Sequence, residues 1–300
     1  IVNAGANSGI LIRDLDHYDA SFSTGQGSHG EWAARTAGTW GNSLRVEICA
    51  ESTAYEQDLS TNNLVNTSTS AVGDTSIVVD DADASGYAFN VGDLISFYSD
   101  TANTTAVDDF NEYEVTAINT STNALTIRLK DDPSGAGLQT AIPDDSKIKR
   151  RWKYADLFSG APGTSEYNTN NGRGSNDELH VVVADADGKV TGFDTDTAGN
   201  RTKAVIETFG NMSKNSSAKS PQGDSIYYAD VIRAKSNFIY WTDHISAGSN
   251  WGTDTTTTYT EVIPITIDTL TGGTDDYSTT AGEIEVAYDK FKDTESEDIN

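Results

Sequence analysis

The chain has 300 residues, of which 46 are Asp or Glu and 20 are Lys or Arg, so its formal net charge is −26. A surface this anionic repels phosphate backbones and acidic lipid headgroups, which argues against direct nucleic acid and membrane partners. The length exceeds what one hydrophobic core usually serves, so we expect about two or three domains. The many Ser, Thr, Asn, Asp and Gly residues, with 13 Tyr and 5 Trp, favour a β-rich fold.

The single cysteine and the absence of long apolar runs give further limits. Cys49 lies in the alternating run 44–49, which predicts a buried strand thiol and not a nucleophile, and no internal disulfide is possible. No segment approaches the roughly 18 apolar residues of a membrane helix, and no signal peptide begins at Ile1. We therefore expect a soluble, unsecreted protein. The chain begins without Met and ends at Asn300 where an apolar strand is due, so we expect both ends to be cuts.

The first clear unit is predicted around the tryptophans at 32 and 40. The run 31–36 favours a short helix that ends at Ala37-Gly38, because glycine readily takes the left-handed conformation of a helix end. A turn over 39–43 then leads into a strand over 44–50. Residues 51–71 are polar and rich in Asn, Ser and Thr, which is typical of a linker or an exposed loop.

Short, evenly spaced strands are expected next. They cover 76–79, 92–97, 112–118, 124–129 and 147–152. This spacing predicts a small antiparallel barrel or sandwich.

After an irregular loop near Pro162, the pattern changes again. The valine-rich run 179–183 predicts a buried strand, and Asp187-Gly188 predicts a hairpin turn into 190–193. Further elements are a strand at 205–209, a helix at 227–236, a strand at 238–241 and a loop at 255–258. Strands that alternate with a helix indicate an α/β layered domain.

Residues 25–30 satisfy the glycine pattern of dinucleotide-binding loops. That loop works only when a buried apolar strand leads into it, and residues 19–24 are too polar for such a strand. We interpret the glycines as a flexible loop and expect no cofactor.

Two acidic clusters resemble parts of calcium loops. Asp185 and Asp187 lack both a preceding acidic ligand and the bidentate glutamate at the twelfth place, so a hairpin turn explains them better. Asp80, Asp81 and Asp83 follow a strand and are interpreted as a solvated turn.

Other catalytic patterns are weak. The four histidines, His17, His29, His180 and His244, lack the helical i, i+4 spacing of a zinc pair. No nucleophile elbow or phosphate loop occurs, and we expect no enzyme and no metal site, although paired carboxylates of a glycosidase stay open at this stage. The sequons, such as the one at Asn66, are explained by chance in this composition.

A basic cluster stands out against the acidic background. It consists of Lys147, Lys149, Arg150, Arg151 and Lys153. The alternatives are the solvent face of an alternating strand and a contact with an acidic partner.

The segment Glu31 to Val46, with Trp32, Arg35 and the turn Gly38-Thr39-Trp40-Gly41-Asn42, resembles the corresponding segment of sheath proteins from contractile-tailed phages. Three further blocks follow in that family's order, at 156–165, at 177–188 and at 271–276 with the helix-like run 288–293. The last block resembles the family's Gly-Gly-x-Asp-Gly signature, but Asp276 stands in place of the final glycine.

The resemblance implies an α+β, β-rich multidomain fold, in which an α/β layered core carries an inserted β-barrel or sandwich domain. The implied division is 1–65 as the first part of the core, 66–153 as the inserted surface domain, 154–282 as the rest of the core, and 283–300 as the start of a C-terminal domain that contacts the tail tube. The family-motif residues with structural roles are Trp32, Arg35, Gly38, Trp40, Gly41, Asn42, Gly160, Pro162, Gly163, Gly188, Gly272 and Gly273.

The function that the resemblance implies is mechanical. Subunits stack as hexameric rings around a tail tube, joined by terminal arms that add strands to neighbouring sheets, and contraction drives the tube through the host envelope. The implied partners are other copies of the chain, the tube protein, and the baseplate and tail terminator proteins. The implied location is the virion, with assembly in the host cytoplasm. The alternatives are a β-rich carbohydrate-binding or adhesive surface protein, indicated by Trp241 and Trp251, and a polysaccharide-degrading enzyme.

Overall fold

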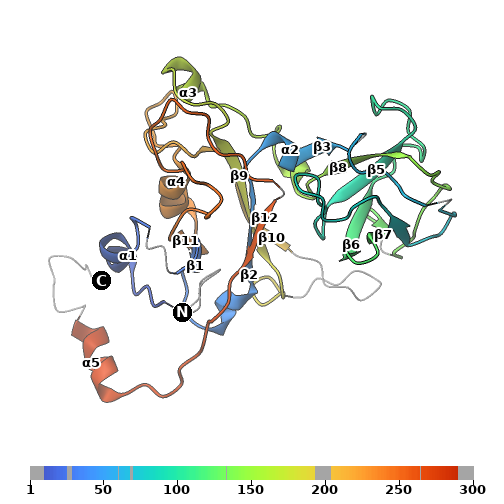
Figure 1. Cartoon of the computed structure of the whole chain (residues 1–300). Helices are drawn as coiled ribbons and strands as arrows, with labels where there is room; N and C mark the ends of the chain where they lie inside the picture. The colour runs from blue at the N-terminus through green and yellow to red at the C-terminus, as the bar shows by residue number, and fades with distance from the viewer. Residues whose placement is uncertain are drawn as a thin grey trace.

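A computed structural model describes residues 10–25, 29–59, 61–67, 70–132, 134–192, 204–263 and 265–289. Figure 1 shows a central sheet, a second sheet on one side of it, and a layer of helix and short strands on the other side. Among these residues no helix is long and apolar enough to cross a bilayer. The architecture is β-rich α+β, as expected in general terms.

The central sheet has four strands in the order β10-β9-β2-β12. They are β2 (Leu44–Cys49), β9 (Glu178–Asp185), β10 (Ala204–Ser213) and β12 (Thr266–Thr269). Every pairing is antiparallel, with Leu44 opposite Asp185 and Cys49 opposite His180. The valine-rich β9 lies inside the sheet and is almost wholly buried, as its sequence predicts.

Both faces of the central sheet are covered by other elements. Successive strand residues point to opposite faces, so neighbouring residues of one strand belong to different core clusters. Leu44, Val46 and Ile48 belong to one core cluster, together with Val181 and Val183 of β9. Their neighbours Cys49 and Val182 belong to a second cluster with Trp152 and Tyr154, on the side of the other sheet. The cover on both faces explains why β2 and β9 are buried almost throughout.

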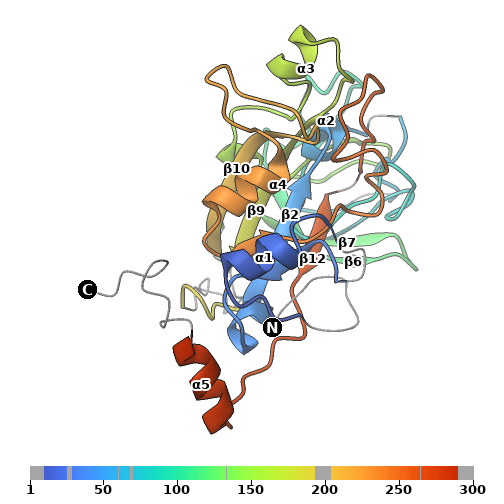
Figure 2. The ribbon, with the colours of Figure 1, turned by 90° about the vertical axis from the view of Figure 1, so that its left-hand side faces the viewer.

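The first face is covered by α4 (Tyr228–Lys235) and by the small sheet formed from β1 (Trp32–Ala34) and β11 (Ile239–Trp241). The short helix α1 (Leu15–Ser21) adds to this layer through Tyr18, which stacks on Tyr240. Figure 2 shows α4 in front of the central sheet with α1 below it. Helix-on-sheet layering is therefore present, but the sheet is antiparallel, so the expectation of an α/β unit is corrected to α+β.

The second sheet has six strands in the order β3-β8-β5-β6-β7-β4, all antiparallel. They are β3 (Glu56–Asp58), β4 (Ser76–Val78), β5 (Leu94–Tyr98), β6 (Tyr113–Asn119), β7 (Ala124–Leu129) and β8 (Lys147–Arg151). Strands over the predicted ranges and their antiparallel order are confirmed. Of the two expected forms, a barrel or a sandwich, the barrel is wrong, because β3 and β4 end the described sheet without pairing with each other.

Residues 51–71 differ from the expected linker. They contain α2 (Ser52–Tyr55) and β3, and Leu59 and Val65 lie fully buried in the core of the second sheet. Apolar side chains spaced through a polar segment anchor it to that core. The division into four domains itself stays a prediction.

Two predictions made from short stretches of sequence are wrong, because contacts with distant residues decide the structure there. Residues 32–34 form a strand and not a helix, because each pairs with a residue of 239–241. Asp187-Gly188 does not lead into a strand at 190–192, and the hairpin partner of β9 is instead β10. Phe193 lies outside the described residues.

The remaining expected elements agree with the structure. The strand near 205–209, the helix near 227–236, the strand near 238–241 and the threonine-rich loop at 255–258 are confirmed. The short elements η1 (Thr39–Ser43), η2 (Ala155–Leu157) and α3 (Glu166–Asn170) lie in connections. The last helix, α5 (Ala281–Asp289), stands away from the body of the molecule (Figures 1 and 2) and includes the first part of the expected 288–293 helix, whose remainder lies outside the described residues.

Candidate functional site

Arg35 joins the first motif segment to the end of α4. Its guanidinium donates to the carbonyl oxygens of Ile232, Arg233 and Ile239, and it lies 4.3 Å from the centroid of the Tyr240 ring. Carbonyls at the C-terminal end of a helix lack partners within the helix and carry partial negative charge, so a cation there is favourable. Arg35 therefore fixes α4 against the β1–β11 pair.

The turn after β1 contacts the last motif block, more than 230 residues away. The backbone N–H of Thr39 donates to Oδ1 of Asp275 at 2.8 Å, and its hydroxyl donates to Oδ2 at 2.6 Å. These bonds lower the pKa of Asp275. Gly38 has φ +115°, and a Cβ atom there would lie 2.6 Å from Oδ1 of Asp275, so only glycine fits without strain.

Asn42 makes a second connection to the same block. Its side-chain amide donates to the Gly273 carbonyl at 3.0 Å, and its Oδ1 accepts from the Gly273 N–H at 2.7 Å. Trp40, two residues earlier, stacks on Phe238. We call Gly38, Thr39, Asn42, Gly273 and Asp275 the motif junction.

The segment around Asp185 and Asp187, interpreted as a turn and not as a calcium loop, is held together by protein donors. Asp185 accepts from the Ser43 hydroxyl, from the N–H groups of Val190 and Thr191, and from the Thr191 hydroxyl. Burial works against ionisation of Asp185, but these hydrogen bonds outweigh it and lower its pKa. Gly188, at φ +70°, allows this turn. These hydrogen bonds to Asp185 hold Val190 and Thr191 in a turn, where a strand was expected.

The block with Gly160, Pro162 and Gly163 lies at the other end of β9. The Gly163 N–H donates to Glu178 Oε2 at 3.0 Å, and the Gly160 carbonyl lies 2.9 Å from Nε2 of His180. Since Glu178 begins β9 and Asp185 ends it, these glycines are not part of the motif junction. The structure therefore places the Gly160 block and Gly188 beyond opposite ends of β9.

Trp32 and Gly41 are buried structural positions. The Trp32 side chain, from β1, is buried in the core against Tyr228, and the centroids of these two rings lie 6.5 Å apart. Gly41 is buried within η1. Gly272, at φ +80°, precedes the junction residue Gly273.

Sequence reasoning missed Lys214, which is fully buried. Its ammonium donates to the carbonyls of Ala50 and Asn176, each at 2.6 Å, and lies 5.2 Å from the Trp251 ring centroid. Burial lowers the pKa of Lys214 to about 8, although the carboxylate of Asp177 opposes this shift. Lys214 sits in a polar run between Met212 and Ser217, so no local pattern signals its burial.

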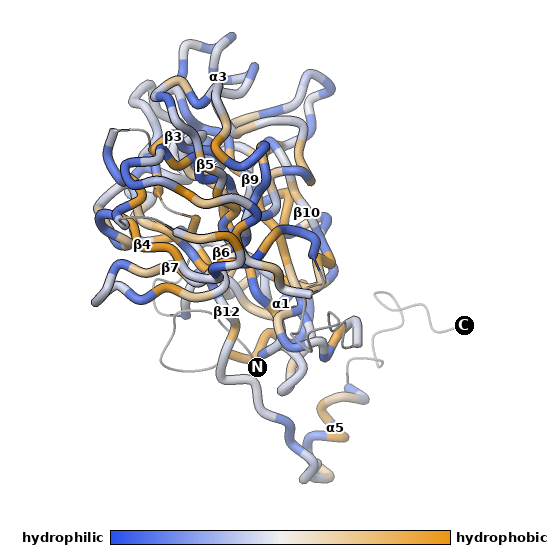
Figure 3. The backbone as a smooth tube through the Cα atoms, turned by 90° about the vertical axis from the view of Figure 1, so that its right-hand side faces the viewer, coloured by the Kyte–Doolittle hydropathy of each residue, from blue (hydrophilic) through white to orange (hydrophobic). Residues whose placement is uncertain are grey.

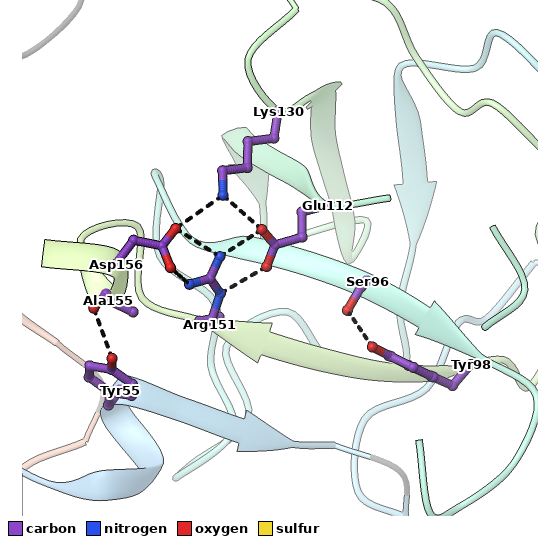
Figure 4. A network of polar contacts seen from close by, with 8 residues as sticks. All are labelled: Tyr55, Ser96, Tyr98, Glu112, Lys130, Arg151, Ala155 and Asp156. Atoms are coloured by element: carbon purple, nitrogen blue, oxygen red, sulfur yellow. Dashed lines mark hydrogen bonds and ion pairs between the residues drawn. The ribbon is translucent and has the colours of Figure 1, made fainter. Parts of the chain in front are cut away.

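Three members of the basic cluster on and after β8, Lys149, Arg151 and Lys153, pair with carboxylates of the same chain. Figure 4 shows Arg151 between Glu112 and Asp156, with Lys130 bridging the same two carboxylates. Burial disfavours the charge of Glu112, but Arg151 and Lys130 outweigh burial and lower its pKa. Arg151 Nε lies 2.8 Å from Glu112 Oε1.

The other members of the basic cluster also have partners. Lys149 pairs with Glu56 at 2.7 Å and Lys153 with Glu114 at 2.8 Å, while Lys147 donates to the Asp145 carbonyl. Arg150 points into the protein and donates to Gln57 at 2.8 Å. The cluster is thus mainly an internal network along one strand.

Cys49 and His180, whose side chains could in principle serve catalysis or metal binding, are both buried. Burial raises the pKa of the Cys49 thiol, as expected for a buried strand residue. His180 stacks on Phe158 and accepts at Nδ1 from the Asn211 N–H, and burial lowers its pKa. Within the described part of the chain, no group of three His, Cys, Asp or Glu side chains could hold a metal ion.

The 25–30 glycine loop has different neighbours from those of a dinucleotide site. The helix α1 precedes it and the strand β1 follows it, which reverses the strand-then-helix order that a pyrophosphate needs. Residues 26–28 lie outside the described residues.

An arm follows the motif junction. We define it as residues 276–289, which contain α5, and no residue of α5 is buried. Exposed apolar side chains include Tyr277 at 90%, Val286 at 64% and Tyr288 at 69%. A capping box starts the helix, since Thr280 and Glu283 bond to each other's backbone N–H groups. Figure 3 shows apolar stretches along α5, away from the rest of the chain.

No protein-family model matches the chain, and no curated protein matches its sequence.

Proposed function

We propose that the chain is a structural subunit of a contractile phage tail sheath, which polymerises around a tail tube and shortens to drive the tube through the host envelope. The observation that carries this proposal is the motif junction at the base of an exposed arm. Residues of the first and last motif blocks bond to each other where the chain leaves the body, between Gly273 and Asp275.

The arm is the surface through which copies would join. An isolated helix of nine residues is marginal in water, because nucleation is costly and few hydrogen bonds repay it. Covering Tyr277, Ile284, Val286 and Tyr288 with a neighbouring copy would stabilise both the helix and the contact. Full burial of one large apolar side chain contributes about 1.5–3 kcal/mol.

The junction would make the arm's base rigid while its outer part stays free to reach a neighbour. Four hydrogen bonds, three donated by Thr39 and Asn42 and one accepted by Asn42, hold residues 273–275 against η1. A sheath that contracts needs an interface with two alternative arrangements, of which the extended one has the higher free energy. Rigid bodies joined by short anchored arms can rearrange in this way without unfolding.

The proposed partners follow from this role. They are other copies of the chain in hexameric rings, the tail tube protein, and the baseplate and tail terminator proteins. The proposed location is the virion, after assembly in the host cytoplasm. The work comes from free energy stored between subunits, so no bond-making step and no cofactor is required.

Sedimentation velocity over a range of concentrations tests the role of the arm. We compare the unaltered chain with the double variant Val286→Asp, Tyr288→Asp, at an ionic strength where the Debye length is about 8 Å, because the net charge of −26 otherwise opposes association. The unaltered chain should form larger species as concentration rises, and the arm variant should stay monomeric.

A matched control uses equally exposed apolar residues on the second sheet's side. Val72 and Phe110 are 67% and 62% exposed, so Val72→Asp, Phe110→Asp adds the same charge away from the arm. The control should associate like the unaltered chain. If the arm variant associates equally well, the arm is not the contact and the proposal loses its main support.

A further inference from the structure

His180 lies where the central sheet meets the second sheet. Among the described residues, the chain passes between these two sheets twice, through α2 and through the segment that follows β8. The fully buried His180 ring contacts both connections. It stacks on Phe158 with ring centroids 4.3 Å apart, and it meets Tyr55 of α2 in an edge-to-face contact at 6.1 Å. We call this contact of His180 with Tyr55 and Phe158 the inter-sheet joint.

Two backbone groups fix the proton on the His180 ring. The Asn211 N–H donates to Nδ1 at 3.0 Å, and because an N–H cannot accept, Nδ1 must hold a lone pair. The proton is therefore on Nε2, which donates to the Gly160 carbonyl at 2.9 Å. Unlike a hydroxyl group, neither backbone group can exchange its role. The neutral ring has both nitrogens bonded, and a second proton has no acceptor at Nδ1.

The Asn211 N–H is itself held in place by an irregularity of β10. The pairing of β10 with β9 shifts register between Phe209 and Met212, and Asn211 has φ +51°. The neighbouring Gly210 packs against Phe158, since a Cβ atom there would lie 3.0 Å from Phe158 Cδ1. β10 thus closes around both stacked rings, and the Asn211 N–H stays directed at Nδ1 while this pairing lasts.

The surroundings of His180 offer little to a positive charge. Burial lowers the pKa of His180, and Glu178 of β9 opposes this shift with a smaller effect. Cys49 lies opposite His180 on β2, and burial raises the pKa of both Cys49 and Tyr55, so they stay uncharged near neutral pH. Stacking on Phe158 favours an imidazolium, but by less than burial of its charge costs. The other titratable groups near the joint are bonded elsewhere or uncharged: Glu47 with the Trp152 indole, Asp156 with Arg151, and Tyr154, whose pKa burial raises.

We propose that His180 is an acid-sensitive latch between the two sheets. A proton taken up at Nδ1 breaks the Asn211 bond and sets two N–H groups against each other, so the ring leaves its place against Phe158 and Tyr55 to reach water. The two connections then separate from β9, and the second sheet is free to turn relative to the central sheet. The latch is closed at neutral pH and opens in acid. It does not depend on the arm.

The pH range follows from the direction of the shift. A histidine that reaches water has a pKa of about 6.5, and folding lowers that of His180, so the closed joint is fully stabilised above about pH 6.5 and loses stability below it. One proton taken up on opening raises the open fraction by up to about tenfold for each pH unit in this range. Asp93, beside β5, acts in the opposite direction, because burial raises its pKa to about 6. Variants are therefore compared with the unaltered chain at the same pH.

Nuclear magnetic resonance tests the latch. With isotopically labelled histidine, the His180 ring of the unaltered chain should carry a proton on Nε2 alone at about pH 7.5. Exchange of the Phe158 and Asn211 amides, corrected for its intrinsic rate, should quicken by up to about tenfold per pH unit between about pH 6.5 and 5.5. His180→Asn places a carbonyl that does not titrate where Nδ1 was, and it should remove this acid response whatever its own stability.

His244→Asn is the matched control. Burial also lowers the pKa of His244, but its Nδ1 faces the hydroxyl of Tyr228, away from the joint. This variant should keep the acid response of the Phe158 and Asn211 amides. Loss of that response in His244→Asn, as in His180→Asn, would assign it to general acid unfolding and overturn the latch.

Electron paramagnetic resonance measures the arrangement of the two sheets. Thr122 and Ser216 are exposed and Cys49 is buried, so spin labels on Thr122→Cys, Ser216→Cys report one distance between the second sheet and the body. Its distribution should broaden from about pH 7.5 to 5.5, and it should stay unchanged with His180→Asn added. The ring proton and this distribution are also measured with His180 in place, so they decide even if His180→Asn does not fold. A protonated Nδ1 at neutral pH, an exchange response that His180→Asn retains, or equal distributions at both pH values would overturn the latch.

Discussion

Replacing Arg35 by lysine should loosen the contact between the first motif segment and α4. The change keeps the positive charge and removes the planar fork that reaches three carbonyl oxygens, those of Ile232, Arg233 and Ile239. A lysine ammonium at the end of a flexible chain can bond to one of these groups at a time in this geometry. The remaining carbonyls at the end of α4 would then lack a charged donor.

The expected cost follows from the bonds that are lost. Hydrogen bonds that involve a charged group contribute about 1.5–3 kcal/mol each, and Arg35 is only partly exposed. Allowing for one retained bond and for the weak geometry of the 3.5 Å contact to Ile232, we expect Arg35→Lys to lower the free energy of unfolding by about 2–3 kcal/mol. Part of the stacking on Tyr240 is also lost.

Urea unfolding, followed by tryptophan fluorescence, measures this change. The control is Arg173→Lys, whose side chain pairs with Asp254 at 3.0 Å on the surface, where such pairs contribute about 0–1 kcal/mol. Amide hydrogen exchange should speed up in the last turn of α4 for Arg35→Lys alone. If both variants lie within about 0.5 kcal/mol of the unaltered chain, Arg35 does not hold α4 as described.

Two further variants test other buried contacts. Between pH 8 and 10.5 an unfolded Lys214 still holds its proton while the folded one releases it. Stability of the unaltered chain relative to Lys214→Met should therefore rise by about 1.5 kcal/mol from pH 8 to 9.5. Equal slopes in urea unfolding would contradict the burial of its charge. Gly38→Ala should cost about 1–3 kcal/mol and speed exchange at the Thr39 amide, because of its φ of +115° and the close Asp275. Gly172→Ala, with φ +60° and open space around it, should cost less, and a cost equal to that of Gly38→Ala would count against the junction.

The parts of the fold that the sequence predicts are those set by local patterns. Alternation of apolar and polar residues locates β6 and β7, and runs of mainly apolar residues locate β5 and β9. The pattern of apolar residues marks a strand whichever strand it pairs with, so the positions of these strands can be inferred without knowing their partners. The helix α4 is equally local, because its four buried residues recur on one side of it.

The errors arise where a distant segment decides the structure. Residues 32–34 have helix-forming neighbours, but pairing with 239–241 makes them a strand. Asp187-Gly188 carries a hairpin signal, but Asp185 captures the N–H groups of Val190 and Thr191 instead. Closure of a sheet into a barrel depends on its first and last strands meeting, which no local pattern specifies.

The same distinction, between features set by the local sequence and features set by distant contacts, holds for the candidate site. The resemblance named Gly38, Asn42 and Gly273, but the sequence does not say that Asn42 and Gly273 bond to each other. The signature includes Asp275 but gives no sign of its bonds to Thr39, and the buried ammonium of Lys214 carries no local signal, since it lies in a polar run. Tertiary contacts alone give these residues their roles.

Negative-stain electron microscopy of the concentrated protein tests the claim of self-assembly most directly. Subunits that join through the arm of one copy and the body of the next should build hollow tubes of stacked rings. The Val286→Asp, Tyr288→Asp variant should yield none, and the Val72→Asp, Phe110→Asp control should yield tubes. Isolated monomers of the unaltered chain at every concentration and ionic strength would contradict a sheath subunit.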